Sequence, residues 1–495
     1  MLAYQTAVAE LYQLGHELHT TAAYKFDLKH MRVLCSALDS PHTKFPSVLI
    51  AGTNGKGSTA ATLASILRAA GYRTGLYTSP HLVRINERIH IDGEAISDAD
   101  FTTGYECVHR VARELVASGR LPWHPSFFET ITALAFRHFA QQGVDMVVAE
   151  VGMGGRLDAT NILEPLVCVI TDIDLDHQKF LGTSIRDIAG EKAGIMRRGR
   201  PLVTLPQHPE ANETLGRAME ETGAVAVNAA RYVAARREAE ANALPGSLPS
   251  DSEKTGAGGP GSQAAGAYQR LRSPRGGELV NQQATHTGFA MDVMGEEVEI
   301  KTPLLGRHQL RNLALAISAA EELVKQGWAI SPQQIAEGIR LTRWPGRFQI
   351  VPAGAAGSRP EMVIDVAHNP AGAWALRAGL SEHFALAGSP SERKLIMIYG
   401  AMRDKAIREV GRILFPLAEK VVLTRAGGNP RAATTRELVE AVGDCGTPLA
   451  EAPNVAEAVR QAIAEARPFG PGALLVITGS IYVVGEAMQA LGVRP

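Results

Sequence analysis

The sequence predicts an α/β protein with two domains: an N-terminal parallel-sheet domain that carries a phosphate-binding loop (P-loop), and a smaller C-terminal Rossmann-like α/β domain. At 495 residues the chain is too long for one ordinary hydrophobic core. Short apolar runs recur along it, each bounded by Gly, Asp or Ser and followed by a helical pattern, which is typical of a parallel sheet covered by helices. These runs form two sets, separated by a segment poor in large apolar residues.

The apolar runs give the positions of the strands. In the N-terminal set we expect strands at 47–51, 74–77, 146–151, 166–171 and 201–205. In the C-terminal set we expect strands at 362–366, 395–399, 420–424 and 474–478. Because apolar residues return after the intervening segment, we also expect an ordered stretch at 289–300 and a helix around 310–325.

Two interruptions of the pattern define the domain organisation. Residues 242–287 are rich in Gly, Ser, Pro, Ala and Gln and cannot bury enough surface to offset their ordering entropy, so we expect a disordered insertion there. Pro and Gly interrupt the pattern again at 342–347, which we interpret as the hinge. The predicted domains are therefore 1–341 and 348–495.

Composition excludes several classes of partner. The formal net charge of -1 provides no overall field that would attract nucleic acid or an anionic membrane, so small molecules are the expected partners. Four cysteines without metal-binding spacing fit a reducing compartment. The N-terminus does not read as a secretory signal, and no apolar run approaches membrane-spanning length, so we expect a cytoplasmic protein.

A glycine-rich loop follows the first predicted strand. The strand 47–51 runs into residues 52–59 and then into an amphipathic helix, the arrangement in which successive backbone N–H groups face a phosphate. Lys56 would supply a mobile cation, and Ser58 would place a hydroxyl near Mg²⁺. The motif departs from the common pattern, since Ile50 stands where the first Gly belongs and Gly57 follows the lysine. The alternative is a structural glycine-rich turn.

Polar side chains gather where the next strands end. Glu150 closes an apolar strand and can hold Mg²⁺ directly or through water; the alternative is an ion pair with Arg156. The following strand leads into the dense polar group 172–177, in which His177 is either a metal ligand or a hydrogen-bonding loop residue. Ser79 also follows a strand and can bring a hydroxyl to the cation.

The second domain repeats this arrangement of polar groups. Asp365 lies near the end of the strand 362–366, and His368 follows it, so an acid and an imidazole stand at another ligand-binding edge. The alternative is an Asp that caps the next helix, but Arg347 in the hinge favours a nucleotide site between the domains. Residue type and helix position alone place Lys192 on a solvated helix surface.

Seven motifs in chain order resemble the folylpolyglutamate synthases, including the bifunctional dihydrofolate synthases, which belong with the Mur-type amide ligases. The resemblance covers nearly the whole chain except 242–287, and the shorter phosphate loop of these enzymes accounts for the unusual motif. The matching segments are 52–58, 78–82, 150–161, 175–177, 191–194, 345–348 and 365–370.

The resemblance implies a role for each matching position, with ATP and two Mg²⁺ ions as cofactors. Expected ATP-binding residues are Thr53, Asn54, Gly55, Lys56, Gly57, Ser58, Asn312, Arg347 and Asp365. Expected metal ligands are Ser79, Glu150, His177 and a carbamylated Lys192, and expected catalytic residues are Lys56, Lys192 and His368, the last near the glutamate pocket. Expected pterin-site residues are Lys25, Phe26, Asp27, Leu28, Phe128, Glu129, Leu157, Asp158 and Ala159.

The implied reaction is ATP-dependent activation of a carboxylate of dihydropteroate or a folyl-glutamate as an acyl phosphate, which the amine of L-glutamate then attacks. We expect a monomer whose ATPase domain closes against the second domain to exclude water. Two alternatives remain. A nucleotide-switch protein is disfavoured because the sequence lacks an Asn-Lys-x-Asp motif, and a Mur ligase of the cell wall is disfavoured by the loop 152–161 and by Ser79-Pro80-His81.

Overall fold

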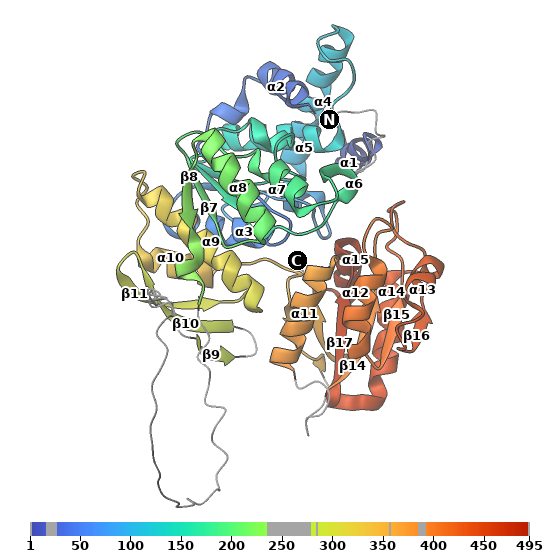
Figure 1. Ribbon diagram of the computed structural model, residues 1–495. Coiled ribbons are helices and arrows are strands. Elements are labelled where there is room, and N and C mark those ends of the chain that lie inside the picture. The colour runs from blue at the N-terminus through green and yellow to red at the C-terminus, as the bar shows by residue number, and fades with distance from the viewer. Residues whose placement is uncertain are drawn as a thin grey trace, which may run out of the picture.

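The computed structural model describes residues 2–15, 27–234, 279–283, 286–355, 358–384 and 393–493. These residues form two α/β units, one running from blue to yellow and one from orange to red in Figure 1. Three sheets are present, of eight, three and six strands. The fold class predicted from the sequence is confirmed.

The eight-stranded sheet of the N-terminal unit has the order β4-β3-β2-β5-β1-β6-β7-β8. It is parallel from β2 to β8, and β3 and β4 continue it as an antiparallel edge. The strands are β1 (Ser47–Ala51), β2 (Thr74–Tyr77), β3 (Ile89–Ile91), β4 (Glu94–Ala95), β5 (Met146–Glu150), β6 (Val167–Ile170), β7 (Pro201–Thr204) and β8 (Val225–Asn228). Two of the predicted strands, 47–51 and 74–77, coincide with β1 and β2.

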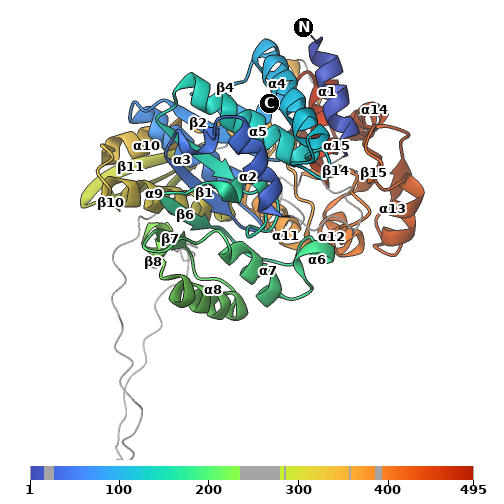
Figure 2. The same cartoon turned by 90° about the horizontal axis from the view of Figure 1, so that it is seen from above.

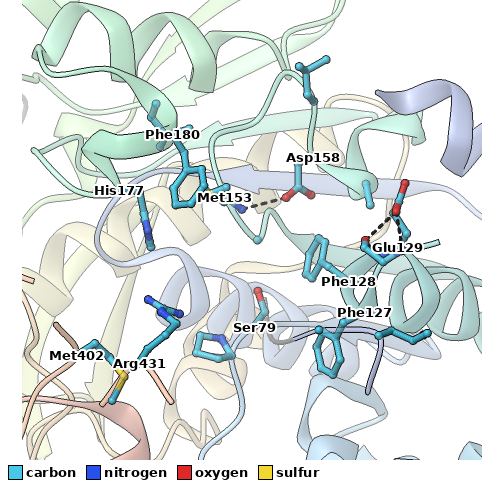
Figure 3. A pocket seen from close by; sticks show the side chains of 18 of the residues that line it. Ser79, Phe127, Phe128, Glu129, Met153, Asp158, His177, Phe180, Met402 and Arg431 are labelled. Carbon is cyan, nitrogen blue, oxygen red and sulfur yellow. Dashed lines mark hydrogen bonds between the residues drawn. The ribbon is translucent and has the colours of Figure 1, made fainter. Parts of the chain in front are cut away.

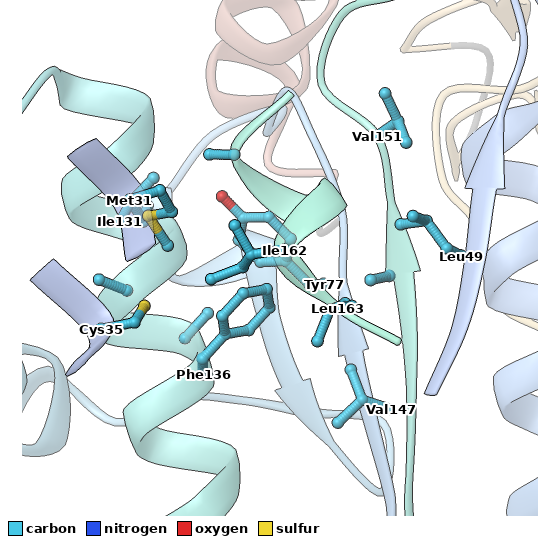
Figure 4. Packing of buried hydrophobic residues seen from close by; sticks show 14 of the residues in the cluster. Met31, Cys35, Leu49, Tyr77, Ile131, Phe136, Val147, Val151, Ile162 and Leu163 are labelled. Atoms are coloured by element: carbon cyan, nitrogen blue, oxygen red, sulfur yellow. The ribbon is translucent and has the colours of Figure 1, made fainter. Parts of the chain in front are cut away.

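Helices cover both faces of this sheet. Side chains alternate along β1, so that Leu49 and Ala51 join one core while Val48 and Ile50 join the other. The first core, seen in Figure 4, lies under α1 (Tyr4–Gln13), α2 (Leu28–Ala37), α4 (Asp98–Ala117), α5 (Phe127–Gln142), α6 (Gln178–Leu181), α7 (Ile185–Ala193) and α8 (Pro209–Thr222). The second core lies under α3 (Lys56–Ala69), α9 (Arg307–Val324) and α10 (Pro332–Arg340).

A small antiparallel sheet extends the second core. It consists of β9 (Leu279–Gln283), β10 (His286–Val293) and β11 (Glu296–Thr302), in the order β11-β10-β9. Strand β9 and the start of β10 fall within the segment predicted to be disordered, so that prediction is wrong at this end. The physical reason is pairing: β9 gains a ladder with β10, whose alternate side chains enter the core. The remainder of that segment lies outside the described residues.

The C-terminal unit contains the six-stranded sheet, in the order β12-β13-β17-β14-β15-β16. Only β12 is antiparallel to its neighbour. The strands are β12 (Gln349–Val351), β13 (Glu361–Ile364), β14 (Lys394–Tyr399), β15 (Lys420–Leu423), β16 (Leu449–Glu451) and β17 (Ala473–Thr478). One face packs on α11 (Pro370–His383), α12 (Ile407–Leu414) and α13 (Thr435–Val442), and the other on α14 (Val455–Ala466) and α15 (Ile481–Leu491).

The predicted hinge joins the two units and runs from the end of α10 to the start of β12. Helix α1 lies near α15 (Figure 2), and the two helices border a cavity of about 340 Å³. No helix in the described ranges is long and apolar enough to cross a membrane. Short 3₁₀ helices occur at Pro41–Thr43, Ile85–Arg88, Ala159–Ile162, Ala229–Tyr232, Phe415–Leu417 and Arg467–Gly472.

Candidate functional site

The glycine-rich loop leaves the carboxyl end of β1 and enters α3, as the sequence predicts. At Gly52 (φ +151°) an added Cβ would lie 1.8 Å from the Thr171 hydroxyl oxygen. Gly55 adopts a left-handed conformation (φ +89°) at the start of α3, where a Cβ would lie 2.2 Å from the side-chain oxygen of Asn312. Both positions therefore require glycine because the backbone passes too close to its neighbours for any side chain.

The first turn of α3 is covered by the hinge. A Cβ at Gly57 would lie 2.6 Å from the ring of Trp344, so the absence of a side chain lets this indole pack on the loop. Lys56 donates through Nζ to the carbonyl of Thr53 at 3.2 Å, and Ser58 is buried. The predicted phosphate ligands thus share one helix N-terminus, where N–H groups and the helix dipole favour an anion.

Asp172 anchors the loop from the neighbouring strand. Its carbonyl oxygen accepts the backbone N–H groups of Thr53 at 2.9 Å and Asn54 at 3.1 Å. Its carboxylate accepts two hydrogen bonds from the guanidinium of Arg311, at 3.0 Å and 2.5 Å. Helix α9, which carries Arg311, therefore holds the loop in place indirectly.

Glu150 ends β5 beside the loop. The side chain is 4% exposed, and its carboxylate accepts the backbone N–H of Ser79 at 3.1 Å. Burial raises the pKa of Glu150, and the opposing effects of Lys56 and of the Ser79 hydrogen bond do not cancel it. The alternative ion pair with Arg156 is wrong, because that guanidinium lies 3.5 Å from Glu191 instead.

Lys192 is buried, at 3% exposed, which contradicts its expected place on a solvated helix surface. Its Nζ donates to the Gly52 carbonyl at 2.9 Å. The reason is that α7 packs this side chain toward the ends of the strands, a tertiary effect that residue type does not reveal. Burial, assisted by the charge of Lys56, lowers the pKa of Lys192 to about 7.

The polar group after β6 turns toward the second unit. His177 adopts φ +52° at the start of α6, and its Nδ1 is buried with no hydrogen-bond partner among the described residues. Burial lowers the pKa of His177 to about 3 despite the nearby Asp176 carboxylate, so the imidazole is neutral. A neutral imidazole with a free nitrogen fits a metal ligand, although hard Mg²⁺ prefers oxygen.

Asp176 links the two units. Its carboxylate lies 2.5 Å from the Nζ of Lys405 and 3.4 Å from the Nε2 of His368. Burial would raise the pKa of Asp176, but the His368 hydrogen bond and the adjacent positive charges hold it well below its usual range. Sequence reasoning missed Lys405, because its pairing with Asp176 depends on a contact between segments distant in sequence.

The second edge is organised around Asp365. Its carboxylate accepts the backbone N–H groups of Phe348 at 2.7 Å and Ala367 at 2.8 Å. Burial raises the pKa of Asp365, against the opposing charges of His308 and Arg347. Asp365 therefore holds the C-terminal end of the hinge in place, next to the half-buried Arg347.

Asn369, and not Asp365, caps α11. Its side-chain oxygen accepts the N–H of Gly372 at 2.8 Å, so the capping alternative for Asp365 is wrong. The amide nitrogen of Asn369 also donates to the side chain of Asn54 in the phosphate loop at 2.9 Å. This hydrogen bond joins the phosphate loop directly to the second unit.

A cavity of about 460 Å³ lies between the two units (Figure 3). It is lined by the predicted residues Asp27, Leu28, Ser79, Phe128, Glu129, Leu157, Asp158, Ala159, His177, Arg347 and His368. Lys25 and Phe26 lie outside the described residues. The loop 53–58, Glu150, Lys192, Asn312 and Asp365 are not among the lining residues. Lining residues that sequence reasoning did not single out include Trp123, Phe180, Met402, Lys405 and Arg431.

Two carboxylates in the cavity wall accept hydrogen bonds from neighbouring residues of the protein. Glu129 accepts both the N–H and the hydroxyl of Ser126 in a capping box at the start of α5 (Figure 3). Asp158 accepts the N–H and the hydroxyl of Thr160, at 3.0 Å and 2.5 Å. The ring of Phe128 adds an apolar, aromatic surface to this wall.

Domain models and sequence relatives agree with this arrangement. Residues 50–205 match the Mur ligase middle domain, and residues 346–481 match the Mur ligase glutamate ligase domain. The dihydrofolate synthase/folylpolyglutamate synthase of Bacillus subtilis is 32% identical, over 94% of this chain and 94% of its own length. The corresponding protein of Mycobacterium tuberculosis is 33% identical, over 94% of this chain and 90% of its own length.

Solved structures with the same architecture include nucleotide complexes. Mycobacterium tuberculosis folylpolyglutamate synthase, complexed with ADP and AMPPCP, superposes with a TM-score of 0.78 at 30% identity, covering 99% of this chain and 100% of that one. Escherichia coli FolC in complex with DHPP and ADP gives a TM-score of 0.74 at 28% identity, with 99% and 98% coverage. The likeness therefore extends over both units.

Proposed function

Because this chain belongs to the Mur ligase family, within its folylpolyglutamate and dihydrofolate synthase group, we propose that it joins L-glutamate to dihydropteroate, to folyl-glutamates, or to both. The co-substrate is ATP, and the products are the amide, ADP and phosphate. The observation that carries this proposal is the cavity between the two units, which brings an apolar aromatic wall to the same space as His177, Arg347 and His368. The nucleotide-switch and cell-wall ligase alternatives have no comparable support.

The reaction proceeds in two steps. An oxygen of the acceptor carboxylate attacks the γ-phosphorus of ATP, the bond from that phosphorus to the bridging oxygen breaks, and ADP leaves. The neutral amine of glutamate then attacks the carbonyl carbon of the acyl phosphate, the nitrogen loses a proton to solvent, and phosphate departs as the amide forms. The protein has to align the reactants and balance the negative charge that collects on the phosphate oxygens.

The N-terminal unit supplies the phosphate ligands. Residues 53–58 offer backbone N–H groups at the start of α3, and Lys56 adds a positive charge for the outer phosphates. Asn312 borders the loop at Gly55, while Arg347 and Asp365 approach from the hinge side. In this arrangement ATP lies where the two units meet, and its presence favours their closure over the cavity.

In the proposed reaction, residues beside the loop would hold two Mg²⁺ ions. Glu150 offers a buried carboxylate, Ser79 a hydroxyl, and His177 a nitrogen that has no hydrogen-bond partner among the described residues. No cluster of His, Cys, Asp or Glu in the described ranges is large enough to hold a metal alone. A site here therefore needs ligands of other types. Bound Mg²⁺ would neutralise charge on the transferred phosphoryl group.

Carbamylated Lys192 is the proposed additional ligand. Its neutral amine adds to CO₂ and loses a proton, which replaces a cation by a carbamate with two hard oxygen atoms. A buried amine with a pKa near 7 is available in its neutral form at physiological pH. An unmodified ammonium at this position would repel the metal ions instead.

The acceptor and glutamate occupy the rest of the cavity. The pterin would pack on Phe128 within the wall formed by Asp27, Leu28, Glu129 and residues 157–159. Glutamate would enter from the C-terminal unit beside His368, which positions it near the acyl phosphate. We expect the enzyme to act as a cytoplasmic monomer on these small molecules, without nucleic acid or membrane partners.

The test is a turnover assay that follows ADP release and amide formation together. Purified protein, ATP, Mg²⁺ and glutamate are incubated with either dihydropteroate or tetrahydrofolate. We expect both acceptors to support turnover, and ADP release to depend on the acceptor. Turnover with neither acceptor would refute the proposal, and activity on a nucleotide-linked cell-wall precursor would support the cell-wall ligase alternative instead.

A further inference from the structure

Exposed hydrophobic side chains gather around the mouth of the cavity. The described residues include seven large hydrophobic side chains that are exposed, and three of them, Trp123, Leu157 and Phe180, line this cavity. Single exposed hydrophobic residues are ordinary, whereas several around one opening mark a surface that an apolar ligand covers. These three side chains therefore extend the recognition surface beyond Phe128.

Phe180 is held in place by the short helix α6. Its N–H donates to the carbonyl of His177 at 2.9 Å. The next residue, Leu181, is buried and lies so close to Gly154 that a Cβ there would be 2.9 Å from its methyl group. Gly182 ends the helix with φ +101°. The backbone of α6 is therefore fixed on the adjacent loop, while the Phe180 side chain remains 41% exposed.

The two phenylalanines occupy different walls of the cavity. Figure 3 shows Phe180 on the wall formed by α6, near His177, and Phe128 on the wall formed by α5. Phe128 is itself supported from behind, since a Cβ at Gly152 would lie 2.4 Å from its ring. An extended ligand with two separate aromatic groups can contact both side chains at once.

We propose that Phe180 determines acceptor specificity by packing against the aryl ring that carries the reacting carboxylate. This inference rests on the proposed function. In dihydropteroate the reacting carboxylate is bonded directly to the benzoyl ring, whereas in a folyl-glutamate at least one glutamyl residue separates them. Phe180 lies one helical turn from His177, and because the proposed function makes His177 a metal ligand, the reacting end of the acceptor lies beside it. The benzoyl ring of dihydropteroate falls against Phe180, and that of a folyl-glutamate is displaced from it.

The test compares acceptors in the variants Phe180→Ala and Phe180→Leu. For Phe180→Ala we expect the KM for dihydropteroate to rise about ten-fold, the size of a lost aromatic contact with its buried area. The KM values for tetrahydrofolate, ATP and glutamate should change less than about two-fold, and Phe180→Leu should recover part of the loss. Trp374→Ala is the matched control, since Trp374 is an exposed aromatic residue that does not line the cavity.

Equilibrium titration of dihydropteroate without ATP provides a second readout, and it should show the same loss of affinity. Equal KM changes for both acceptors, or no change for either, would overturn the inference. Wild-type protein that uses neither acceptor would instead refute the proposed function. Thermal melting identifies a folding defect, and if Phe180→Ala does not fold, Phe180→Leu and Phe180→Tyr decide the matter by the same KM ratio.

Discussion

The two sheets present their ligand-binding edges to each other, but the two edges are built from different parts of the chain. At the N-terminal edge the backbone determines the shape, because Gly52 and Gly55 leave no room for a side chain. At the C-terminal edge charged side chains determine it, with Asp365 bound to two backbone N–H groups and Lys405 reaching across to Asp176. The shape of the first edge is therefore set by a rigid backbone, whereas the side chains at the second edge can change conformation.

This difference assigns different tasks to the two units. A rigid backbone loop is suited to binding phosphate groups, which the proposed reaction requires with every acceptor. Small changes in the geometry of such a loop should therefore impair the reaction. Long side chains such as Lys405 can follow the motion of a domain, and their contacts can break and re-form as the cavity opens. Substitutions at the first edge should therefore be far more damaging than substitutions at the second.

The largest expected effect is at Lys192. Lys192→Ala should lower kcat by about a thousand-fold, comparable to loss of a key electrostatic group. Lys192→Arg should fail to restore activity, because the guanidinium group of arginine stays positively charged and does not form a carbamate. In wild-type protein, activity below a pH of about 7 should fall and become dependent on added bicarbonate, since the amine, whose pKa is lowered to about 7, is then protonated. Steady-state rates and the mass of the native protein provide the measurement.

Wild-type rates in Lys192→Arg would contradict the carbamate and leave Lys192 as a tether for the Gly52 carbonyl. In that case the backbone shape of the first edge would be sufficient by itself.

The next largest effect is expected at Gly55. Gly55→Ala should lower kcat/KM for ATP by about a hundred-fold. The new Cβ would displace Asn312, and the phosphate loop would shift away from its productive position. Gly71→Ala is a matched control with nearly the same conformation, since φ is +91° at Gly71 and +89° at Gly55. Apart from its chain neighbours, however, no described residue has an atom within 4 Å of a Cβ at Gly71. The control should lose only about 1 kcal/mol of stability and keep its activity.

Calorimetric titration with a non-hydrolysable ATP analogue and thermal melting separate the two effects. If the two substitutions proved equally harmful, backbone strain and not contact with Asn312 would be the cause.

The smallest effect is expected where Lys405 of the second edge pairs with Asp176 of the N-terminal unit. Lys405→Met and Asp176→Asn should each lower kcat/KM by roughly ten-fold, and the double variant should be no worse than either, with a coupling energy of about 1–2 kcal/mol. Arg403→Met is the control, because the partners of the Arg403 side chain among the described residues, Glu437 and the carbonyl of Pro430, both lie in the C-terminal unit. Additive effects in the double variant would show that Lys405 and Asp176 act independently.

The sequence predicted the buried strands best. Residues 47–51 and 74–77 coincide with β1 and β2 because both are fully buried apolar runs with polar boundaries. Strands β4 and β8 were not predicted, since their residues are mostly exposed and only pairing with a neighbour makes them strands. The local sequence pattern therefore identifies strands that are buried in the core. It does not identify edge strands, because these depend on tertiary contacts.

The candidate site was predictable only in part. Glycine-loop spacing and the ends of strands identified the right segments, and the Ser126 to Glu129 spacing carried a capping-box signal that was overlooked. The burial of Lys192 and the ion pair of Asp176 with Lys405 had no local signal, because each depends on contacts between segments distant in sequence. Their roles in the reaction remain predictions.

The contact of Trp344 with Gly57 gives the protein an internal optical probe. The chain has four tryptophans, and each stands in a different environment. Trp344 packs on the phosphate loop, Trp123 lines the cavity, Trp328 packs edge-on against Tyr72, and Trp374 lies under Arg377 on α11. Replacing the other three by phenylalanine leaves one emitter beside the nucleotide site. If the loop binds ATP as proposed, the emission of Trp344 should change on binding, and the order of substrate binding can be followed without an attached dye.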